Sequence, residues 1–188
     1  MEPAGWPEPV LIVISGMQGA GKTTVASRLA RRFPRGVWIN ADALQQLIVS
    51  GGRWPEGRSM SADAARQLRL RLRHACLLGQ SFVEAGFTTV IDHIVIGERL
   101  DELLEELAGQ RFLFVMLTPP LEVVQQRKRG RGTRLWEEWG WMDEEIRTST
   151  RRLGLWLDSS DQSVDETVDE IMRRIWTEGW VDAAARSE

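Results

Sequence analysis

Residues 16–23 of this chain read Gly16-Met17-Gln18-Gly19-Ala20-Gly21-Lys22-Thr23 and follow the pattern G-x-x-x-x-G-K-[ST]. Immediately upstream, residues 10–14 form an unbroken apolar run rich in β-branched side chains, which predicts a buried parallel strand. Downstream, apolar residues recur at helical spacing; they are Val25, Ala26, Leu29, Ala30 and Phe33. The stretch therefore lies between a strand and a helix, in the order that gives this pattern a structural meaning.

The glycines of this loop predict contact with phosphate groups. They let successive backbone N–H groups converge on phosphate oxygens at the positive end of the following helix. Lys22 then reaches the β- and γ-phosphates, and the Thr23 hydroxyl is placed to ligate Mg²⁺. The chain holds 22 arginines and two lysines, so a lysine in the one slot where the loop needs it supports the motif. We predict that the protein binds a nucleoside triphosphate.

Length and composition are those of a globular protein with one domain. The chain has 188 residues, of which 43% are hydrophobic and 27% charged. Its net charge of −3 argues against nucleic acid as the main partner, because binding to a phosphate backbone goes with a basic excess. No apolar run is long enough to span a membrane, and residues 1–5 lack the features of a secretion signal. We therefore expect a cytoplasmic protein, with the single Cys76 as a small buried helix residue.

Beyond the glycine loop, short apolar runs alternate with helical patterns, which predicts an α/β fold with a mostly parallel sheet. Four further strands are expected, at residues 37–39, 88–92, 112–117 and 155–157. Helices are expected at residues 43–49, 62–84, 98–107 and 121–129, from about residue 143, and after Ser163, which forms a capping box with Glu166. Residues 50–61 are rich in glycine and other breakers and predict a mobile loop.

The long helix at 62–84 carries an apolar face, which we assign to Leu68, Leu72, Ala75, Cys76, Leu78, Phe82 and Val83. The whole pattern indicates a single domain over residues 10–180. Residues 1–9 are then an N-terminal extension, and residues 181–188 are expected to form a loose C-terminal tail.

Two carboxylates follow predicted strands. Asp92 ends the strand at 88–92, and Asp42 follows the strand at 37–39. Since ligands of open parallel sheets bind at the carboxyl ends of the strands, we expect both to face the crevice beside the glycine loop. Asp92 suits either a magnesium ligand or a cap of the next turn. Asp42 suits a base that accepts a proton from a substrate hydroxyl, the N-cap of a helix from Ala43, or both. His93 is expected to be structural.

Basic residues surround two glycines after the helix at 121–129; they are Arg127, Lys128, Arg129, Arg131 and Arg134. One interpretation is a glycine-hinged lid, at about residues 127–142, that closes over the nucleotide and places Arg127 and Arg131 on its phosphates. The other interpretation is a solvated helix end that the helix dipole favours.

Two further groups of residues leave alternatives open. Arg66, Arg69 and Arg73 share one face of the long helix, where they suit an anionic substrate or a solvated surface equally. Four tryptophans lie in polar or glycine-rich segments and suit either the wall of a substrate pocket or ordinary burial; they are Trp54, Trp136, Trp139 and Trp141.

Together these features resemble the small P-loop kinases, a group that includes chloramphenicol phosphotransferase, gluconate and shikimate kinases, zeta-toxin sugar-nucleotide kinases and tunicamycin-resistance ATP-binding proteins. The resemblance spans residues 10–176 and rests on residues 16–24, Asp42, Asp92, the turn at 117–122 and the run at 157–160. It implies a P-loop NTPase fold, a three-layer sandwich with a five-stranded parallel sheet and a mobile lid, and it implies ATP and Mg²⁺ as cofactors. The segment at 136–141 matches no family pattern, so the resemblance does not name the acceptor.

The resemblance also implies roles for single residues. Nucleotide contacts would come from Gly16, Met17, Gln18, Gly19, Ala20, Gly21, Lys22, Thr23, Thr24 and Arg127. Metal ligation would come from Thr23 and Asp92. Catalysis would rest on Asp42 as the base, with Lys22, Arg127 and Arg131 stabilising the charge on the transferred group.

We therefore expect an ATP- and Mg²⁺-dependent phosphotransferase that acts on a hydroxyl of a small molecule, such as tunicamycin, chloramphenicol or a sugar nucleotide. The alternative is an ATP-binding resistance protein that sequesters a drug with little turnover. A regulatory GTPase is disfavoured, because guanine recognition in that class uses an Asn-Lys-x-Asp run and neither lysine lies in one. A kinase acting on RNA ends remains an option through the arginine patches. The sequence predicts no oligomeric state.

Overall fold

The structure is a computed structural model that describes residues 8–129 and 140–184. Several residues of the sequence predictions lie outside the described residues; they are Arg131, Arg134, Trp136 and Trp139. Most of the predicted lid at about 127–142 therefore lies outside them as well. The predicted tail is described as far as residue 184.

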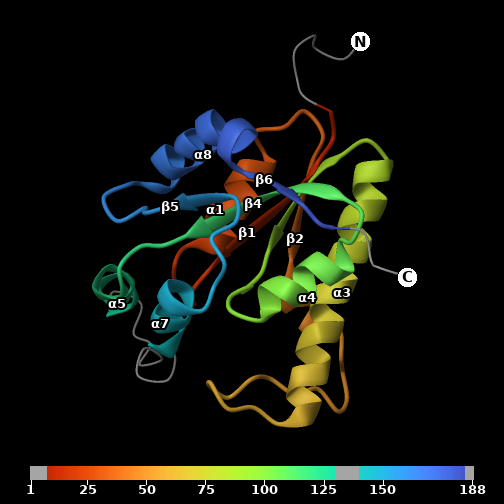
Figure 1. Cartoon of the computed structure of the whole chain (residues 1–188), viewed down its shortest axis with the longest axis vertical. Coiled ribbons are helices and arrows are strands. Elements are labelled where there is room, and N and C mark those ends of the chain that lie inside the picture. Colours follow the sequence, from red (N-terminus) through yellow and green to blue (C-terminus); the bar gives the residue numbers. More distant parts are fainter. Residues whose placement is uncertain (1–7, 130–139, 185–188) are drawn as a thin grey trace.

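The described residues form one sheet of six strands (Figure 1). The strands are β1 (Leu11–Gly16), β2 (Gly36–Asn40), β3 (Thr88–Asp92), β4 (Arg111–Leu117), β5 (Leu155–Leu157) and β6 (Trp180–Asp182). The first five are parallel and lie in the order β2-β3-β1-β4-β5, which confirms the predicted α/β fold with five parallel strands. β1 lies at the centre and pairs with both β3 and β4.

The sixth strand corrects the prediction of a loose tail from residue 181. Trp180–Asp182 pairs antiparallel with Arg111–Leu113 of β4. β5 covers only Val115–Leu117 of β4, so the first half of β4 has backbone groups that need another partner, and β6 supplies it. The Arg111 guanidinium also lies 4.1 Å from the centre of the Trp180 ring, which adds a cation–π contact to this pairing.

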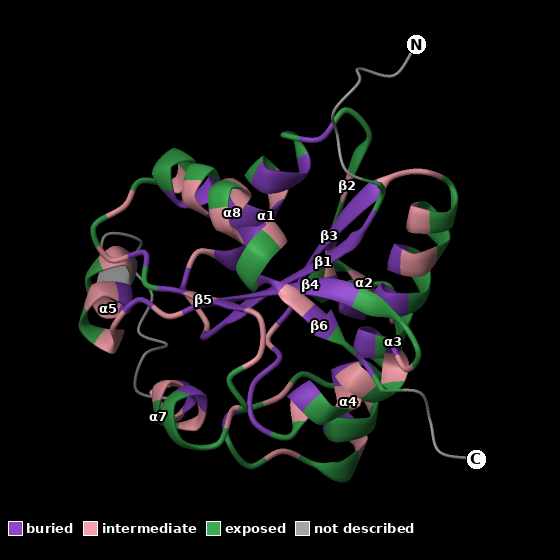
Figure 2. Cartoon of the chain, turned by 45° about the horizontal axis from the view of Figure 1, so that its top comes forward, coloured by how far each residue is buried: buried purple, intermediate pink, exposed green. Residues whose placement is uncertain are grey.

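Helices cover both faces of the sheet. They are α1 (Lys22–Ala30), α2 (Ala41–Gln46), α3 (Ala62–Glu84), α4 (Arg99–Glu106), α5 (Leu121–Arg129), α7 (Trp141–Thr148) and α8 (Val164–Glu178). α1 and α8 lie on one face, and α3 and α4 lie on the other (Figure 2). The sheet between them is largely buried: every residue of β1 and β3 and all of β4 except Arg111 is covered by the two layers. This is the predicted three-layer arrangement.

The apolar face of α3 differs from its prediction at two positions. Leu68, Leu72, Ala75 and Cys76 are buried as expected, but Leu78 is 43% exposed and Phe82 is 37% exposed. The reason lies at Gly79, where a side chain would come within 2.6 Å of Leu11 in β1. The helix approaches the sheet at that glycine, so the line of closest packing passes through position 79 and leaves 78 and 82 on the outer side.

Helix α2 begins earlier than predicted, and this changes the role of one carboxylate. The Asn40 side chain accepts a hydrogen bond of 2.8 Å from the backbone N–H of Ala43, so Asn40 is the N-cap. The interpretation of Asp42 as the N-cap is therefore wrong, and its carboxylate lies in the first turn of α2. α7 also begins two residues before the predicted Asp143, whereas the capping box of Ser163 and Glu166 is confirmed.

Candidate active site

The glycine loop connects β1 to α1 at the carboxyl edge of the sheet. Three of its glycines have positive φ, with 144° at Gly16, 87° at Gly19 and 97° at Gly21, a region that other residues rarely adopt. A side chain at Gly16 would also come within 2.6 Å of the Leu117 carbonyl oxygen of the neighbouring strand. Since β1 lies between β3 and β4, the loop occupies the point where the strand order reverses, which is where open α/β sheets bind ligands.

Lys22 folds back over this loop. Its side chain is largely buried, and its Nζ donates a hydrogen bond of 2.9 Å to the backbone carbonyl oxygen of Met17. This contact holds the ammonium group above the concave side of the loop, where it faces any bound anion. The first turn of α1 begins at Lys22 itself, so the helix dipole acts in the same direction.

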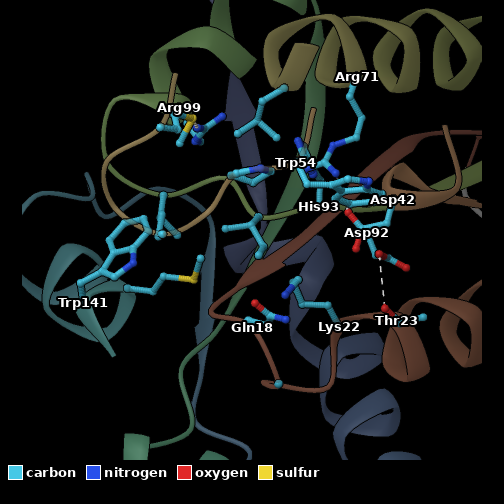
Figure 3. A pocket seen from close by; sticks show the side chains of 18 residues that line it. Gln18, Lys22, Thr23, Asp42, Trp54, Arg71, Asp92, His93, Arg99 and Trp141 are labelled. Carbon is cyan, nitrogen blue, oxygen red and sulfur yellow. Dashed lines mark hydrogen bonds and ion pairs between the residues drawn. The ribbon is translucent and has the colours of Figure 1, made fainter. Parts of the chain in front are cut away.

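Two cavities adjoin the loop and share part of it as a wall. The central cavity, about 240 Å³ in volume, lies between the loop and the α3 and α4 layer (Figure 3). The loop cavity, about 640 Å³, lies on the other side, against the first turn of α8. Residues common to both cavities are Gln18, Gly19, Lys22 and Thr23. The loop thus separates two binding spaces while Lys22 and Thr23 face both.

Asp92 lies at the floor of the central cavity and is buried. The indole N–H of Trp38 donates a hydrogen bond of 2.8 Å to Asp92 Oδ2, and the Thr23 hydroxyl lies 3.5 Å from Oδ1. The amide of Asn40 lies 3.4 Å from both oxygens. Burial raises the pKa of Asp92, although the Trp38 hydrogen bond and the charge of Lys22 act in the opposite direction.

This pair of oxygen groups suits a divalent cation. A buried carboxylate whose ionised form is disfavoured gains from a nearby cation, and a threonine hydroxyl is an ordinary oxygen ligand. Among residues 8–129 and 140–184, no three His, Cys, Asp or Glu side chains gather into a metal cage made by protein alone. A cation held by Thr23 and Asp92 would therefore share its remaining ligands with water and with the phosphates of a nucleotide.

Asp42 lies at the rim of the central cavity, where Arg71 of α3 holds it. Arg71 Nη1 donates to Asp42 Oδ1 at 2.8 Å; the Asp42 side chain is 63% exposed and that of Arg71 only 6%. The Arg71 guanidinium also lies 5.6 Å from the centre of the Trp54 ring. Burial lowers the pKa of Arg71, and the Asp42 charge partly offsets this. The base candidate thus has one fixed partner and one face open to the cavity.

His93 lies next to Asp92 on the wall of the same cavity and is buried. Burial lowers the pKa of His93 well below its usual range, and the positive charges of Arg71, Arg99 and Lys22 lower it further. The imidazole is therefore neutral at neutral pH and is poorly suited to bind a proton during a reaction.

The structure brings Asp42, Asp92 and the glycine loop together on one cavity, together with Trp54 and Trp141. Arg127 lies instead on the loop cavity, where its Nη2 donates to the carbonyl oxygen of Ser159 at 2.6 Å. Three of the predicted arginines lie on the exposed face of α3 and line neither cavity; they are Arg66, Arg69 and Arg73. Arg66 and Arg69 form surface ion pairs with Asp63 and Glu105.

Two arginines that line the central cavity, Arg71 and Arg99, were not predicted from the sequence. Arg71 comes three residues after Leu68 and four before Ala75, so it falls on the buried stripe of an amphipathic helix. A charge on that stripe is a signal that the sequence did contain. Arg99 begins α4 and offers no comparable signal, because nothing in its neighbours distinguishes it from the many surface arginines.

A comparison with protein-family models matches residues 11–138 to the AAA domain. The match covers well over half of the sequence. The chain belongs to the AAA domain family. A search of curated proteins finds no match to this AAA-domain protein.

Solved structures similar to the AAA-domain protein include small-molecule kinases and a resistance protein. A sugar kinase from Janibacter sp. HTCC2649 has a TM-score of 0.64 and 20% identity, over 88% of this chain and 93% of that one. The APS kinase CysC of Mycobacterium tuberculosis, in complex with AMPPNP and APS, has a TM-score of 0.60 and 21% identity, over 89% and 98%. The Deinococcus radiodurans tunicamycin resistance protein has a TM-score of 0.62 and 19% identity, over 90% and 96%. At these identities the likeness shows a shared fold.

No helix within residues 8–129 and 140–184 of the AAA-domain protein is both long and apolar enough to cross a bilayer. The longest, α3, carries four arginines along its length.

Proposed function

We propose that this AAA-domain protein is a kinase that transfers the γ-phosphate of ATP to a hydroxyl group of a small molecule. The observation that carries this proposal is the pair of cavities that meet at the glycine loop and share Lys22 and Thr23. A protein that only binds or hydrolyses a nucleotide needs one such space. A kinase needs two, one for the donor and one for the acceptor, joined at the group that is transferred.

The donor belongs in the loop cavity. Residues 16–24 supply backbone N–H groups at the start of α1, and Arg127 lies across the opening beside Ser159. Thr23 and Asp92 would hold Mg²⁺, which when bound offsets charge on the phosphate oxygens. Lys22 then neutralises charge that develops on the transferred group, and Arg127 and Arg131 would add to this if residues 127–142 form the predicted lid.

The acceptor belongs in the central cavity, with its hydroxyl beside Asp42. The acceptor oxygen forms a bond to the γ-phosphorus as the bond from that phosphorus to the ADP oxygen breaks. The hydroxyl proton passes to the Asp42 carboxylate, and the ion pair with Arg71 fixes the orientation of that carboxylate. Trp141, at the start of α7, and Trp54, in the segment between α2 and α3, line the space and so limit the access of water.

The similar structures support the proposed kinase function. They include a sugar kinase and an APS kinase with AMPPNP and APS bound, whose names describe phosphoryl transfer to small molecules. The tunicamycin resistance protein is a reason to include antibiotics among the acceptors that are screened. We place the reaction in the cytoplasm, where ATP is available.

An acceptor screen tests this proposal. The full chain is incubated with Mg²⁺ and ATP and with hydroxylated antibiotics, sugars, sugar acids and nucleosides, and the products are identified by mass spectrometry. We expect one class of compound to gain a single phosphoryl group, with equal release of ADP, and Lys22→Met to abolish it. A compound that binds tightly but is recovered unchanged in the presence of ATP would support sequestration instead.

A further inference from the structure

Two arginines, Arg71 and Arg99, enter the central cavity from the side opposite the glycine loop. Figure 3 shows both above the cavity, with Gln18, Lys22 and Thr23 below it. The transfer reaction itself uses the loop side, so it leaves unexplained why two cations lie deep on the acceptor side. The charge of Arg99 lowers the pKa of Arg71, and the charges of both arginines lower the pKa of His93, as expected for groups that lie close together.

Arg99 has weak partners in the described part of the chain. Its Nη2 donates to the thioether sulfur of Met60 at 3.6 Å, which is a poor acceptor for a guanidinium. Arg99 forms no ion pair with residues 8–129 or 140–184, although Glu102, one turn further along α4, acts on it through its charge. Burial accordingly lowers the pKa of Arg99. A guanidinium placed in this way has strong donors available for a ligand.

Arg71 is more deeply buried, and only part of its donor set is used. One guanidinium nitrogen reaches Asp42, but the Nε–H is buried and has no hydrogen-bond partner among the described residues. Leaving a charged donor buried and unpaired costs free energy, so such a group indicates that an acceptor arrives from outside the protein. The side chain is 6% exposed and lines the cavity, so that acceptor would come from a molecule bound there.

The balance of charge in the cavity points to an anion. When the donor nucleotide and its cation are bound, Lys22 faces phosphate oxygens and Asp92 faces the cation. Asp42 is then the remaining carboxylate on the cavity wall, opposite two guanidinium groups. Glu102 acts on Arg99 from outside this wall, so one negative charge on the acceptor would balance the groups that line the cavity. Arginine forks bind carboxylate and phosphate groups through paired hydrogen bonds.

The other walls define the rest of the acceptor. Apolar and aromatic side chains cover them, chiefly Trp54, Leu68, Ile94, Trp141 and Met142. The cavity of about 240 Å³ lies at the small end of ligand sites, so it suits a molecule built on one ring or a short chain.

We propose that the acceptor is a small hydroxylated anion of the carboxylate class, whose charged group is bound between Arg71 and Arg99 and whose body packs against Trp54 and Trp141. This inference rests on the proposed kinase function, since it assigns the central cavity to the acceptor. It adds that Arg71 and Arg99 determine specificity by selecting an acid over its neutral counterpart.

Matched pairs of acids and their methyl esters test the proposal by calorimetry. The probes are hydroxylated ring and chain carboxylates, for example 3-hydroxybenzoate and methyl 3-hydroxybenzoate, added to protein saturated with Mg²⁺ and AMPPNP. The nucleotide analogue fills the loop, so the probe cannot bind there. We expect at least one acid to bind about tenfold or more tightly than its ester. Equal binding of acid and ester in every pair, or no binding by any acid, would overturn the proposal.

Variants locate the binding group. Arg99→Gln is expected to weaken binding of the acid about tenfold or more and to leave binding of the ester and of AMPPNP unchanged; Arg99→Lys should recover part of the loss. Arg73→Gln is the matched control, because Arg73 lies on the exposed face of α3 and should change nothing. An Arg99→Gln protein that keeps the full preference for the acid would contradict the assignment. Failure of AMPPNP to bind the original protein would instead count against the kinase function, and the anion test can then be run without nucleotide.

Discussion

Arg71 and Asp42 form an ion pair of 2.8 Å in which the arginine is almost fully buried and the aspartate is mostly exposed. The pair links the middle of α3 to the first turn of α2, across the opening of the central cavity. Its asymmetry has a consequence for chemistry. The rigid partner is the cation, held by the helix and by the Trp54 ring, while the carboxylate keeps one oxygen toward the cavity and water. Asp42 is thus oriented without being sealed off from a substrate.

Replacing Asp42 should separate catalysis from nucleotide binding. We predict that Asp42→Asn lowers kcat by about 10²–10⁴-fold, the range expected for loss of a general base, because the amide cannot accept the proton. Binding of AMPPNP, measured by calorimetry, should not change. Asp101→Asn serves as the control, because Asp101 pairs with Arg151 on the exposed surface. Full activity in Asp42→Asn would remove Asp42 from the mechanism.

Replacing Lys22, unlike replacing Asp42, should weaken nucleotide binding as well as abolish transfer. Its ammonium is held over the glycine loop by the Met17 carbonyl oxygen and would lose its contact with the phosphates in Lys22→Met. We predict that ATP binding weakens by about 1.5–3 kcal/mol, the usual size of a hydrogen bond to a charged group. The fold should persist, as judged by an unchanged circular dichroism spectrum. ATP affinity equal to that of the original protein would show that the loop does not bind phosphate as inferred.

Trp38 should act as a positioning residue for Asp92. Its indole N–H donates the shortest hydrogen bond that the Asp92 carboxylate accepts. Trp38→Phe removes this donor and keeps an aromatic ring. We predict that the Mg²⁺ concentration needed for half-maximal binding of AMPPNP rises by up to about tenfold. Trp180→Phe is the matched control, since Trp180 lies in β6 at the far edge of the sheet. Equal magnesium dependence in both variants would limit Trp38 to a structural role.

Cys76 should make stability depend on pH in the alkaline range. Burial, aided by the charge of Glu106, raises the pKa of the Cys76 thiol from 9.0 to about 12. The unfolded chain therefore loses this proton first, so the stability that the thiol contributes is complete below about pH 9 and is lost as the pH rises toward 12. We predict that the free energy of unfolding falls by about 2 kcal/mol more between pH 9 and 11 in the original protein than in Cys76→Ala.

Denaturant titrations at several pH values measure this difference in slope. The chain has no tyrosine and only two lysines, so few other groups titrate in the same range. Parallel slopes for the original protein and Cys76→Ala would show that the thiol ionises as readily in the folded state as in the unfolded one.

The parts of the site that the sequence predicts are those fixed by local rules. Each glycine of the loop meets a backbone requirement, which is positive φ at Gly16, Gly19 and Gly21, and the flanking strand and helix have clear periodicity. Asp42 and Asp92 follow from the parallel topology alone, since the ends of neighbouring parallel strands meet at one edge.

The parts that the sequence does not predict depend on contacts between distant segments. β6 forms because β5 leaves half of β4 without a partner, which no three-residue pattern can reveal. Arg99 reaches the cavity only because α4 packs beside α3 over the sheet. Arg71 is partly predictable. The helical periodicity places it on the buried side of α3, but its ion pair with Asp42 joins residues 29 positions apart and cannot be read from a local pattern.

The central claim is that the two cavities at the glycine loop are a donor site and an acceptor site for phosphoryl transfer. Phosphorus NMR of a complete reaction, with ATP, Mg²⁺ and an acceptor found in the screen, tests it most directly. The account predicts that the γ-phosphate signal of ATP is replaced by that of a phosphate ester on the acceptor, in equal amount to the ADP formed. A γ-phosphate recovered as inorganic phosphate, or left on ATP while the acceptor stays bound, would contradict it.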